Sequence, residues 1–317
     1  MDSQTQGNYT NPIIDVDMPD PGVLKDGNTY WMTHTMGSIP ACPLWRSTDL
    51  VHWKFHNHLL TAENAPSWVH NRFWAPEIHR VGKRYILLYT AGDKSGHLCI
   101  GSAIANRVDG PYKTFDKPLI DGSAMGVIDP TLFTDDDGRV YLFWKDDGND
   151  VGKPCHLFVQ EMEDPGVRFS RGSHPITLMT SQAAGWENGI IEGPEVVKRN
   201  GWYYLFYSGS GYSSGYAEGV ARSRSITGPY ERCPHNPILR SNSEWVNPGH
   251  GSFIQDAAGS MWHYYHAYHA ANHDHGRVQL LDRVYFDSPD DWPRIAKNGT
   301  PGITASPGPR VGTRLDR

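Results

Sequence analysis

The chain has 317 residues, and 35 acidic against 29 basic side chains give a net charge of −6 with histidine neutral. This mildly acidic balance argues against nucleic-acid binding, which depends on clustered lysine and arginine, and no apolar run approaches the roughly 18 residues of a membrane-spanning helix. The aromatic residues number 37 and the glycines and prolines together 56, a composition that favours short strands joined by turns and excludes a coiled coil, a helical bundle or a disordered chain.

Five segments along the chain combine a turn glycine with an aromatic strand. The glycines lie 55, 56, 63 and 58 residues apart, at Gly27, Gly82, Gly138, Gly201 and Gly259. In each segment the glycine supplies a turn, and alternating aromatic residues form the strand that follows, as in a β-hairpin. The repeat predicts an all-β fold, a five-bladed β-propeller. We expect residues 1–317 to form a single domain, with its core at about 10–295 and a closing or loose C-terminal tail. A two-sheet sandwich is the alternative, which the chain-long repeat disfavours.

A chemically distinctive residue precedes each turn glycine at nearly the same distance. Asp20 lies seven residues before its glycine, Trp74 eight, and Asp129, Glu192 and His250 nine. The first strand of each blade lines the central channel of a propeller, so these side chains should converge at one end of it. Proline directly follows Asp20 and Asp129, which predicts an extended backbone at both acids.

Three converging carboxylates suggest glycoside hydrolysis. Crowded carboxylates cannot all ionise freely, so one keeps its proton near neutral pH. A protonated acid and an ionised carboxylate are the pair that glycosidases use, and aromatic side chains nearby can stack on a sugar ring.

These motifs resemble glycoside hydrolase family 43, whose members are five-bladed propellers acting on arabinose- and xylose-containing polysaccharides. The resemblance covers roughly residues 10–295, and its strongest matches are Pro19-Asp20-Pro21-Gly22, Val127-Ile128-Asp129-Pro130 and Ile191-Glu192-Gly193-Pro194. It implies Asp20 as general base, Glu192 as general acid, and Asp129 as the carboxylate that orients the acid and raises its pKa. It also implies an inverting reaction, with base and acid roughly 6.5–9.5 Å apart.

The same resemblance implies further contacts to substrate from Trp74, Ile128, His250 and Arg277. His250 would also lie near a calcium or other cation in the central channel, through water, while the chemistry itself needs no cofactor. Three assignments have alternatives: Glu195 or Glu187 as the acid, Arg283 in place of Arg277, and plain packing roles for Trp74 and His250. The histidines at 263, 266, 269, 273 and 275 fall on an alternating strand and its loop without tidy ligand spacing, and we interpret them mainly as structural.

We therefore expect an exo-acting α-L-arabinofuranosidase, with a plant cell-wall polysaccharide such as arabinan or arabinoxylan as its partner. A β-xylosidase or an endo-arabinanase is the alternative within the family, and a non-catalytic glycan-binding propeller is the alternative of another class. The related invertase-like propellers retain configuration and carry a Glu-Cys pair, whereas no glutamate precedes a cysteine here.

We expect a monomer that binds neither nucleic acid nor membrane. The first thirty residues contain no basic segment followed by an apolar one, so we expect no signal peptide in this sequence. An extracellular location is nevertheless our prediction, with the cytoplasm as the alternative. The four cysteines are widely spaced and form no CxxC motif, which argues against a zinc site and leaves any disulfide pairing open.

Overall fold

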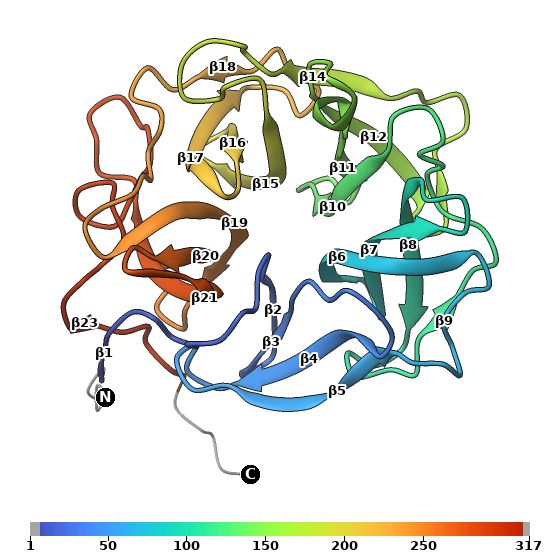
Figure 1. Cartoon of the computed structure of the whole chain (residues 1–317), viewed down its shortest axis with the longest axis horizontal. Helices are drawn as coiled ribbons and strands as arrows, with labels where there is room; N and C mark the ends of the chain where they lie inside the picture. Colours follow the sequence, from blue (N-terminus) through green and yellow to red (C-terminus); the bar gives the residue numbers. More distant parts are fainter. Residues whose placement is uncertain (1–6, 313–317) are drawn as a thin grey trace.

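The computed structural model describes residues 7–312, and within this range it forms five antiparallel sheets arranged as the blades of a propeller (Figure 1). The predicted all-β, five-bladed fold is therefore confirmed. Each blade is built from consecutive strands, and its first strand lies nearest the central axis in Figure 1. No helix within the described range is long and apolar enough to cross a membrane.

The strands of the five blades follow one another along the chain. Blade one comprises β2 (Gly22–Asp26), β3 (Thr29–Thr33), β4 (Ala41–Ser47) and β5 (Lys54–Leu60). Blade two comprises β6 (Val69–Val81), β7 (Arg84–Asp93), β8 (Leu98–Ala105) and β9 (Lys113–Thr114). Blade three comprises β10 (Val127–Thr134), β11 (Val140–Asp146), β12 (His156–Asp164) and β13 (Arg168–Phe169), with β14 (Ile176–Thr180) also paired to β12 and a short 3-10 helix at Gly148–Val151.

Blade four comprises β15 (Ile191–Arg199), β16 (Trp202–Gly211), β17 (Ser214–Ser223) and β18 (Glu231–Arg232). Blade five comprises β19 (Trp245–Gln255), β20 (Met261–His269), β21 (Asn272–Tyr285) and β22 (Arg294–Ile295). A two-stranded sheet of β1 (Asn8–Tyr9) and β23 (Ser306–Pro307) joins the two ends of the described chain.

The five predicted hairpins are the connections between the first and second strands of the blades. Their glycines all have a positive φ, between 59° at Gly27 and 85° at Gly138, a conformation that glycine adopts without steric cost. The aromatic residues after these turns pack between blades. Tyr30, Tyr85, Tyr141 and Trp262 are all buried.

Each pair of neighbouring blades encloses its own hydrophobic cluster. Tyr85 lies in the cluster between blades one and two, Tyr141 in that between blades three and four, and Trp262 in that between blades five and one. Apolar burial is thus spread around the ring, and each blade is held by both neighbours. The four cysteines are buried and free, at positions 42, 99, 155 and 233.

Each inner strand has a residue with positive φ within it or just before it, and this corrects one prediction. The angles are 59° at Asp20, 41° at Ala75, 56° at Asp129, 58° at Gly193 and 45° at His250. The extended backbone predicted for Asp20 and Asp129 is therefore wrong. In blades two to five the ladder shifts register at this place, as at β-bulges. Such strained conformations persist only where surrounding contacts fix them.

The positive-φ residues also show that the alignment of the five repeats made from the sequence is wrong by one residue in two blades. In β6 and β15 the residue with positive φ is Ala75 and Gly193, so Trp74 and Glu192 lie one position earlier. Asp20 and Asp129 do occupy equivalent positions, but Glu192 does not. Its side chain consequently has a different set of neighbours.

Candidate active site

Asp20 lies just before β2 at the centre of a cluster of donors. Its Oδ2 accepts a hydrogen bond from the Thr35 hydroxyl at 2.6 Å. Its Oδ1 lies 3.2 Å from Nη1 of Arg277 and 3.4 Å from Nδ1 of His250. The backbone N–H of Asp20 also donates to Nδ1 of His266 at 3.2 Å. These contacts from blades one and five fix both the carboxylate and its strained backbone.

The same contacts set the charge of Asp20. Burial alone would raise the pKa of this carboxyl group, but Arg277, His250 and His266 together hold it well below its usual range. Burial lowers the pKa of His266 to about 4, so this ring is neutral near pH 7 and acts as a hydrogen-bond partner. Asp20 is therefore an ionised carboxylate, as a general base must be.

Glu192 lies at the start of β15 and is held by two side chains. Its Oε2 is 3.0 Å from Nζ of Lys145, and its Oε1 accepts a hydrogen bond from the Tyr216 hydroxyl at 2.7 Å. Lys145 has no exposed side-chain surface and also lies 3.3 Å from Oδ1 of Asp147. Burial would raise the pKa of Glu192, but Lys145 and Tyr216 lower it.

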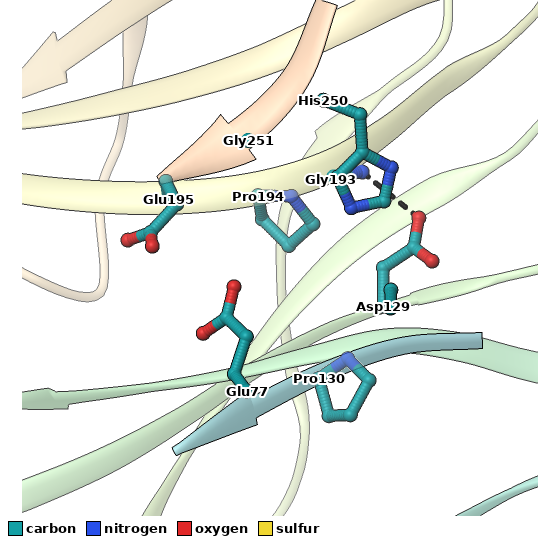
Figure 2. A pocket seen from close by; sticks show the side chains of 9 residues that line it. Glu77, Asp129, Pro130, Gly193, Pro194, Glu195, His250 and Gly251 are labelled. Carbon is teal, nitrogen blue, oxygen red and sulfur yellow. Dashed lines mark hydrogen bonds between the residues drawn. The ribbon is translucent and has the colours of Figure 1, made fainter. Parts of the chain in front are cut away.

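Asp129, in β10 of blade three, connects this blade with β15, the strand that carries Glu192. Its Oδ2 accepts a hydrogen bond from the backbone N–H of Gly193 at 2.9 Å, directly after Glu192 (Figure 2). Its own N–H donates to the Thr90 hydroxyl at 3.1 Å. Burial and the nearby charge of Glu192 raise the pKa of Asp129 to about 6, although His250 and Lys145 oppose them.

The other predicted site residues surround this group to different degrees. His250 packs against Gly193, where an added Cβ would lie 3.0 Å from the imidazole ring. Arg277 contacts Asp20 and lies 4.8 Å from the ring of exposed Tyr212. Trp74 is half-buried, with the Arg72 guanidinium over its ring at 5.7 Å. Ile128 is buried next to Asp129.

The structure separates the alternative assignments. Arg283 is exposed and packs on Tyr285, whereas Arg277 reaches Asp20. Glu187 is fully buried and bonded to Arg232 and Tyr207. Both of its oxygens therefore take part in a structural ion pair.

Glu195 faces Glu77 on the side of the pocket away from Asp129 and His250 (Figure 2). Burial and the charge of Glu77 raise the pKa of Glu195 well above its usual range. Its protonation would suit a general acid, so the structure leaves Glu195 open as the alternative. Glu192 as the general acid stays a prediction.

Three carboxylates and one imidazole line this pocket, from Glu77, Asp129, Glu195 and His250. Carboxylate oxygens are the ligands that hard divalent cations such as calcium prefer, but among the described residues no three of these groups have ligand atoms within 4.8 Å of one another. A cation here would relieve the repulsion between Glu77 and Glu195. Calcium at this place stays a prediction.

Three important contacts were missed in the sequence, and a fourth, from His266, had been interpreted as mainly structural although it reaches Asp20. These contacts come from outside the first strands: Thr35, Lys145, Tyr216 and His266. The spacing from the turn glycines pointed only to residues of the first strands. Lys145 and Glu192 are 47 residues apart, and His266 and Asp20 are 246 apart. The one signal available was Lys145 itself, a charged residue within the apolar segment Val140–Asp146, which is buried throughout.

The propeller fold and the carboxylate-lined end of its channel are characteristic of a class of glycan-processing enzymes. The model of glycosyl hydrolases family 43 matches residues 9–293. The chain belongs to this family.

Several named relatives and solved structures are similar over nearly the whole chain. A xylan 1,3-beta-xylosidase from Vibrio sp. is 28% identical over 92% of this chain, and a non-reducing end alpha-L-arabinofuranosidase from Bacteroides ovatus is 29% identical over 94%. The matches cover 58% and 55% of those two proteins, so this chain spans little more than half of their length. A solved thermostable family-43 glycoside hydrolase superposes with a TM-score of 0.85 at 28% identity, covering 96% of this chain and all of that one.

Proposed function

We propose that the protein is an inverting, exo-acting α-L-arabinofuranosidase that releases L-arabinofuranose from arabinan or arabinoxylan. The observation that carries the proposal is the buried, ionised carboxylate of Asp20 beside Arg277 and His250. It shares one end of the channel with Asp129 and with Glu192, which contacts Lys145. Membership of family 43 supports the reaction class.

In the proposed reaction Asp20 accepts a proton from a water molecule whose oxygen attacks the anomeric carbon. Glu192 donates its proton to the glycosidic oxygen as the bond between carbon and leaving group breaks. The new bond forms on the face opposite to the leaving group, so the configuration inverts. One proton has entered Asp20 and one has left Glu192, and exchange with water restores both. The chemistry uses no cofactor.

Asp129 would act on the proton of Glu192. Above a pH of about 6 most Asp129 is negatively charged, and a negative charge nearby favours the protonated form of a second carboxyl group. Lys145 acts in the opposite direction. The two residues would therefore set the pH range in which Glu192 holds a proton.

The sugar specificity rests on the relatives. Proteins named as α-L-arabinofuranosidases, from Bacteroides ovatus and Cellvibrio japonicus, support arabinose. A β-xylosidase is the second candidate, because the Vibrio relative and a putative beta-xylosidase from Xylanibacter ruminicola carry that name. An endo-arabinanase is a third.

A substrate panel tests the proposal. Aryl α-L-arabinofuranoside, aryl β-D-xyloside, linear and branched arabinan, arabinoxylan and xylan would be compared, and proton NMR would identify the first-formed anomer. We expect release of arabinose with inversion. Faster cleavage of the xyloside would favour the second candidate, and initial retention would contradict the mechanism.

Two isosteric variants test the assigned roles. Asp20→Asn and Glu192→Gln should each lower kcat/KM on polysaccharide by about 10²–10⁴-fold, the usual contribution of general acid–base catalysis. Glu195→Gln is the matched control and should retain the greater part of the activity. Equal rates in wild type and both variants would indicate a glycan-binding propeller without catalysis.

A further inference from the structure

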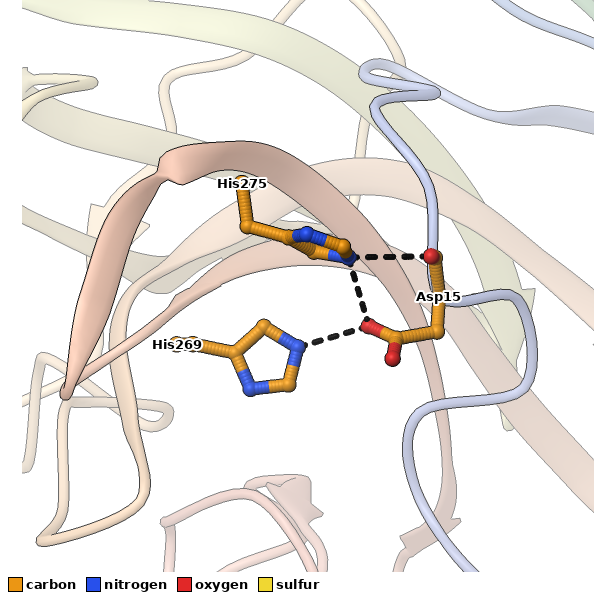
Figure 3. Close-up of side chains that lie close together, drawn as sticks. All are labelled: Asp15, His269 and His275. Atoms are coloured by element: carbon orange, nitrogen blue, oxygen red, sulfur yellow. Dashed lines mark hydrogen bonds and ion pairs between the residues drawn. The ribbon is translucent and has the colours of Figure 1, made fainter.

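A group of two imidazoles and one carboxylate lies outside the proposed catalytic site. Nε2 of His269 is 2.7 Å from Oδ1 of Asp15, and Nε2 of His275 is 3.1 Å from the same oxygen (Figure 3). The three donor atoms all lie within 4.8 Å of one another. Asp15 comes from the segment before β2, and the histidines come from β20 and β21.

We propose that Asp15, His269 and His275 bind a first-row divalent transition-metal ion, with Zn²⁺ as the best match. Imidazole nitrogen and carboxylate oxygen are common zinc ligands, and at bond lengths of about 2.0–2.1 Å tetrahedral ligand atoms lie roughly 3.4 Å apart. The two distances from Asp15, 2.7 and 3.1 Å, are shorter than that spacing, as expected for hydrogen bonds in the ion-free cluster. Modest side-chain rotations would open the cluster around an ion, and water would complete the coordination.

The protonation of the rings is compatible with metal binding. Among residues 7–312 neither Nδ1 of His269 nor Nδ1 of His275 has a hydrogen-bond partner. Without an ion, Nε2 of each ring faces Oδ1 of Asp15, and Nε2 of His275 also lies 2.9 Å from the carbonyl oxygen of Asp15, so Nε2 carries the proton. When an ion replaces these hydrogen bonds, the proton can move to Nδ1 and leave the Nε2 lone pair for the ion. His275 is exposed and His269 is half-buried against Trp245 at a centroid distance of 4.6 Å. The site is thus accessible from solvent, and one ring is held in place.

Beside the cluster, the backbone of the N-terminal segment lies close against that of β21. Gly276 has a φ of 89°, and a Cβ there would lie 2.5 Å from Cβ of Asp17. The N-terminal segment therefore lies directly on β21. The N–H of Arg277 donates to Oδ1 of Asp17 at 2.8 Å, and the N–H of Met18 donates to the carbonyl of Arg277 at 2.9 Å.

A bound ion would fasten the segment that leads to Asp20 onto the blade that supplies Arg277. Asp15 precedes Asp20 by five residues, and His275 precedes Arg277 by two. The ion would link residues 254 and 260 positions apart, and it would lie where the first and last blades meet. Its expected effect is on the stability of ring closure, and the catalytic proposal does not depend on it.

Metal titration of the full-length, untagged and metal-stripped chain tests the site. Wild type should bind one equivalent of Co²⁺ with visible d–d absorption, and Zn²⁺ should displace it. At a Zn²⁺ concentration 100-fold above Kd the Tm should rise by about 4 °C. Mg²⁺ and Ca²⁺ should not displace the bound Co²⁺, because they prefer all-oxygen sites.

Variants locate the ion. Asp15→Asn and His275→Ala should weaken Co²⁺ binding about tenfold or more, whereas His273→Ala on the same hairpin turn should bind like wild type. Asp20→Asn is a second control, because Asp20 also lies beside two histidines. Circular dichroism would verify that each variant is folded. The proposal is overturned if wild type binds no Co²⁺, if Asp15→Asn and His275→Ala bind unchanged, or if Asp20→Asn alone loses the ion.

Discussion

At the scale of single residues, Lys145 is the side chain that most affects the proposed acid. It lies in β11 with no exposed surface, 3.0 Å from Glu192 and 3.3 Å from Asp147. Burial would lower the pKa of a lone lysine, but the surrounding carboxylates raise that of Lys145. It is therefore a fixed positive charge that favours ionised Glu192, whereas the proposed reaction needs protonated Glu192.

Replacing Lys145 should shift the pH dependence of the reaction. In Lys145→Met the pKa of Glu192 should rise, because an adjacent opposite charge has been removed. A general acid works only while protonated, so the limb on which kcat/KM falls with rising pH should move to higher pH. Lys145→Arg keeps the charge and should leave the limb near its wild-type position. A shift to lower pH would show that Glu192 is not the acid.

Tyr212 is the most exposed aromatic side chain near Asp20. It lies in the turn between β16 and β17, is 51% exposed, and has Arg277 over its ring at 4.8 Å. An exposed ring that packs on the arginine partner of the proposed base is placed to stack on a sugar. Tyr212→Ala should raise KM about tenfold with little change in kcat, and Tyr212→Phe should behave like wild type. A fall in kcat at unchanged KM would assign the ring to positioning Arg277.

At the scale of elements, the bulged inner strand is the unit that builds the site. Each of the five inner strands has a positive-φ residue within it or just before it, and in four of the blades the ladder shifts register at that place. At Gly193 both the backbone conformation and the space available require glycine. Its φ is 58°, and an added Cβ would lie 3.0 Å from the ring of His250.

Gly193→Ala tests this element. Alanine at positive φ costs about 1–2 kcal/mol of stability, and its methyl group should displace His250 and the N–H that binds Asp129. We expect both a lower unfolding free energy and a loss of activity of at least about tenfold, measured by urea unfolding and by kcat/KM. Gly138→Ala is the control, because Gly138 has a φ of 85° in a turn with no atom near its absent Cβ. It should lose stability and retain activity.

The sequence predicted elements better than the conformations inside them. Gly27 and its four counterparts were sufficient to locate the hairpins, because a tight turn followed by aromatic residues is a local property. The positive φ of Asp20 and Asp129 could not be predicted, because the usual preference before proline favours extended backbone and contacts from another blade override it. The offset at Glu192 arises from the same bulges.

The candidate site was predictable only where its residues lie on inner strands. Asp20, Asp129 and Glu192 were found through their distance from a turn glycine. Lys145 and His266 lie on second strands and reach the channel through tertiary packing, which no spacing in the chain encodes. Their electrostatic effects on Glu192 and Asp20 therefore required the structure.

At the scale of the whole molecule, Asp282 in β21 joins three distant parts of the chain. Its Oδ2 accepts hydrogen bonds from the Tyr265 hydroxyl at 2.7 Å, the Asn11 amide at 3.1 Å and the N–H of Gly302 at 3.2 Å. Blade five, the N-terminal segment and the C-terminal tail thus meet at one buried carboxyl group. Burial raises its pKa to about 6, although these hydrogen bonds oppose the shift.

The raised pKa has a definite consequence for stability. The unfolded chain releases this proton near pH 4 and the folded chain near pH 6. Between these values the folded state binds more protons, so the contribution of Asp282 to stability falls as pH rises and stays low above pH 6. Asp282 therefore stabilises the contact between the two ends of the chain least at neutral pH.

Asp282→Asn should remove this pH dependence. The amide oxygen can accept the same three hydrogen bonds without a charge, so at pH 7 the variant should exceed wild type in unfolding free energy by about 1–3 kcal/mol. The difference should shrink toward pH 4, where the folded chain keeps the proton and the unfolded chain begins to bind it. Urea unfolding at pH 4, 5, 6 and 7 measures it. Asp287→Asn is the control, because Asp287 forms an exposed pair with Arg294, and such pairs contribute about 0–1 kcal/mol. Equal destabilisation of Asp282→Asn at every pH would show that hydrogen-bond geometry, and not the buried charge, governs closure of the ring.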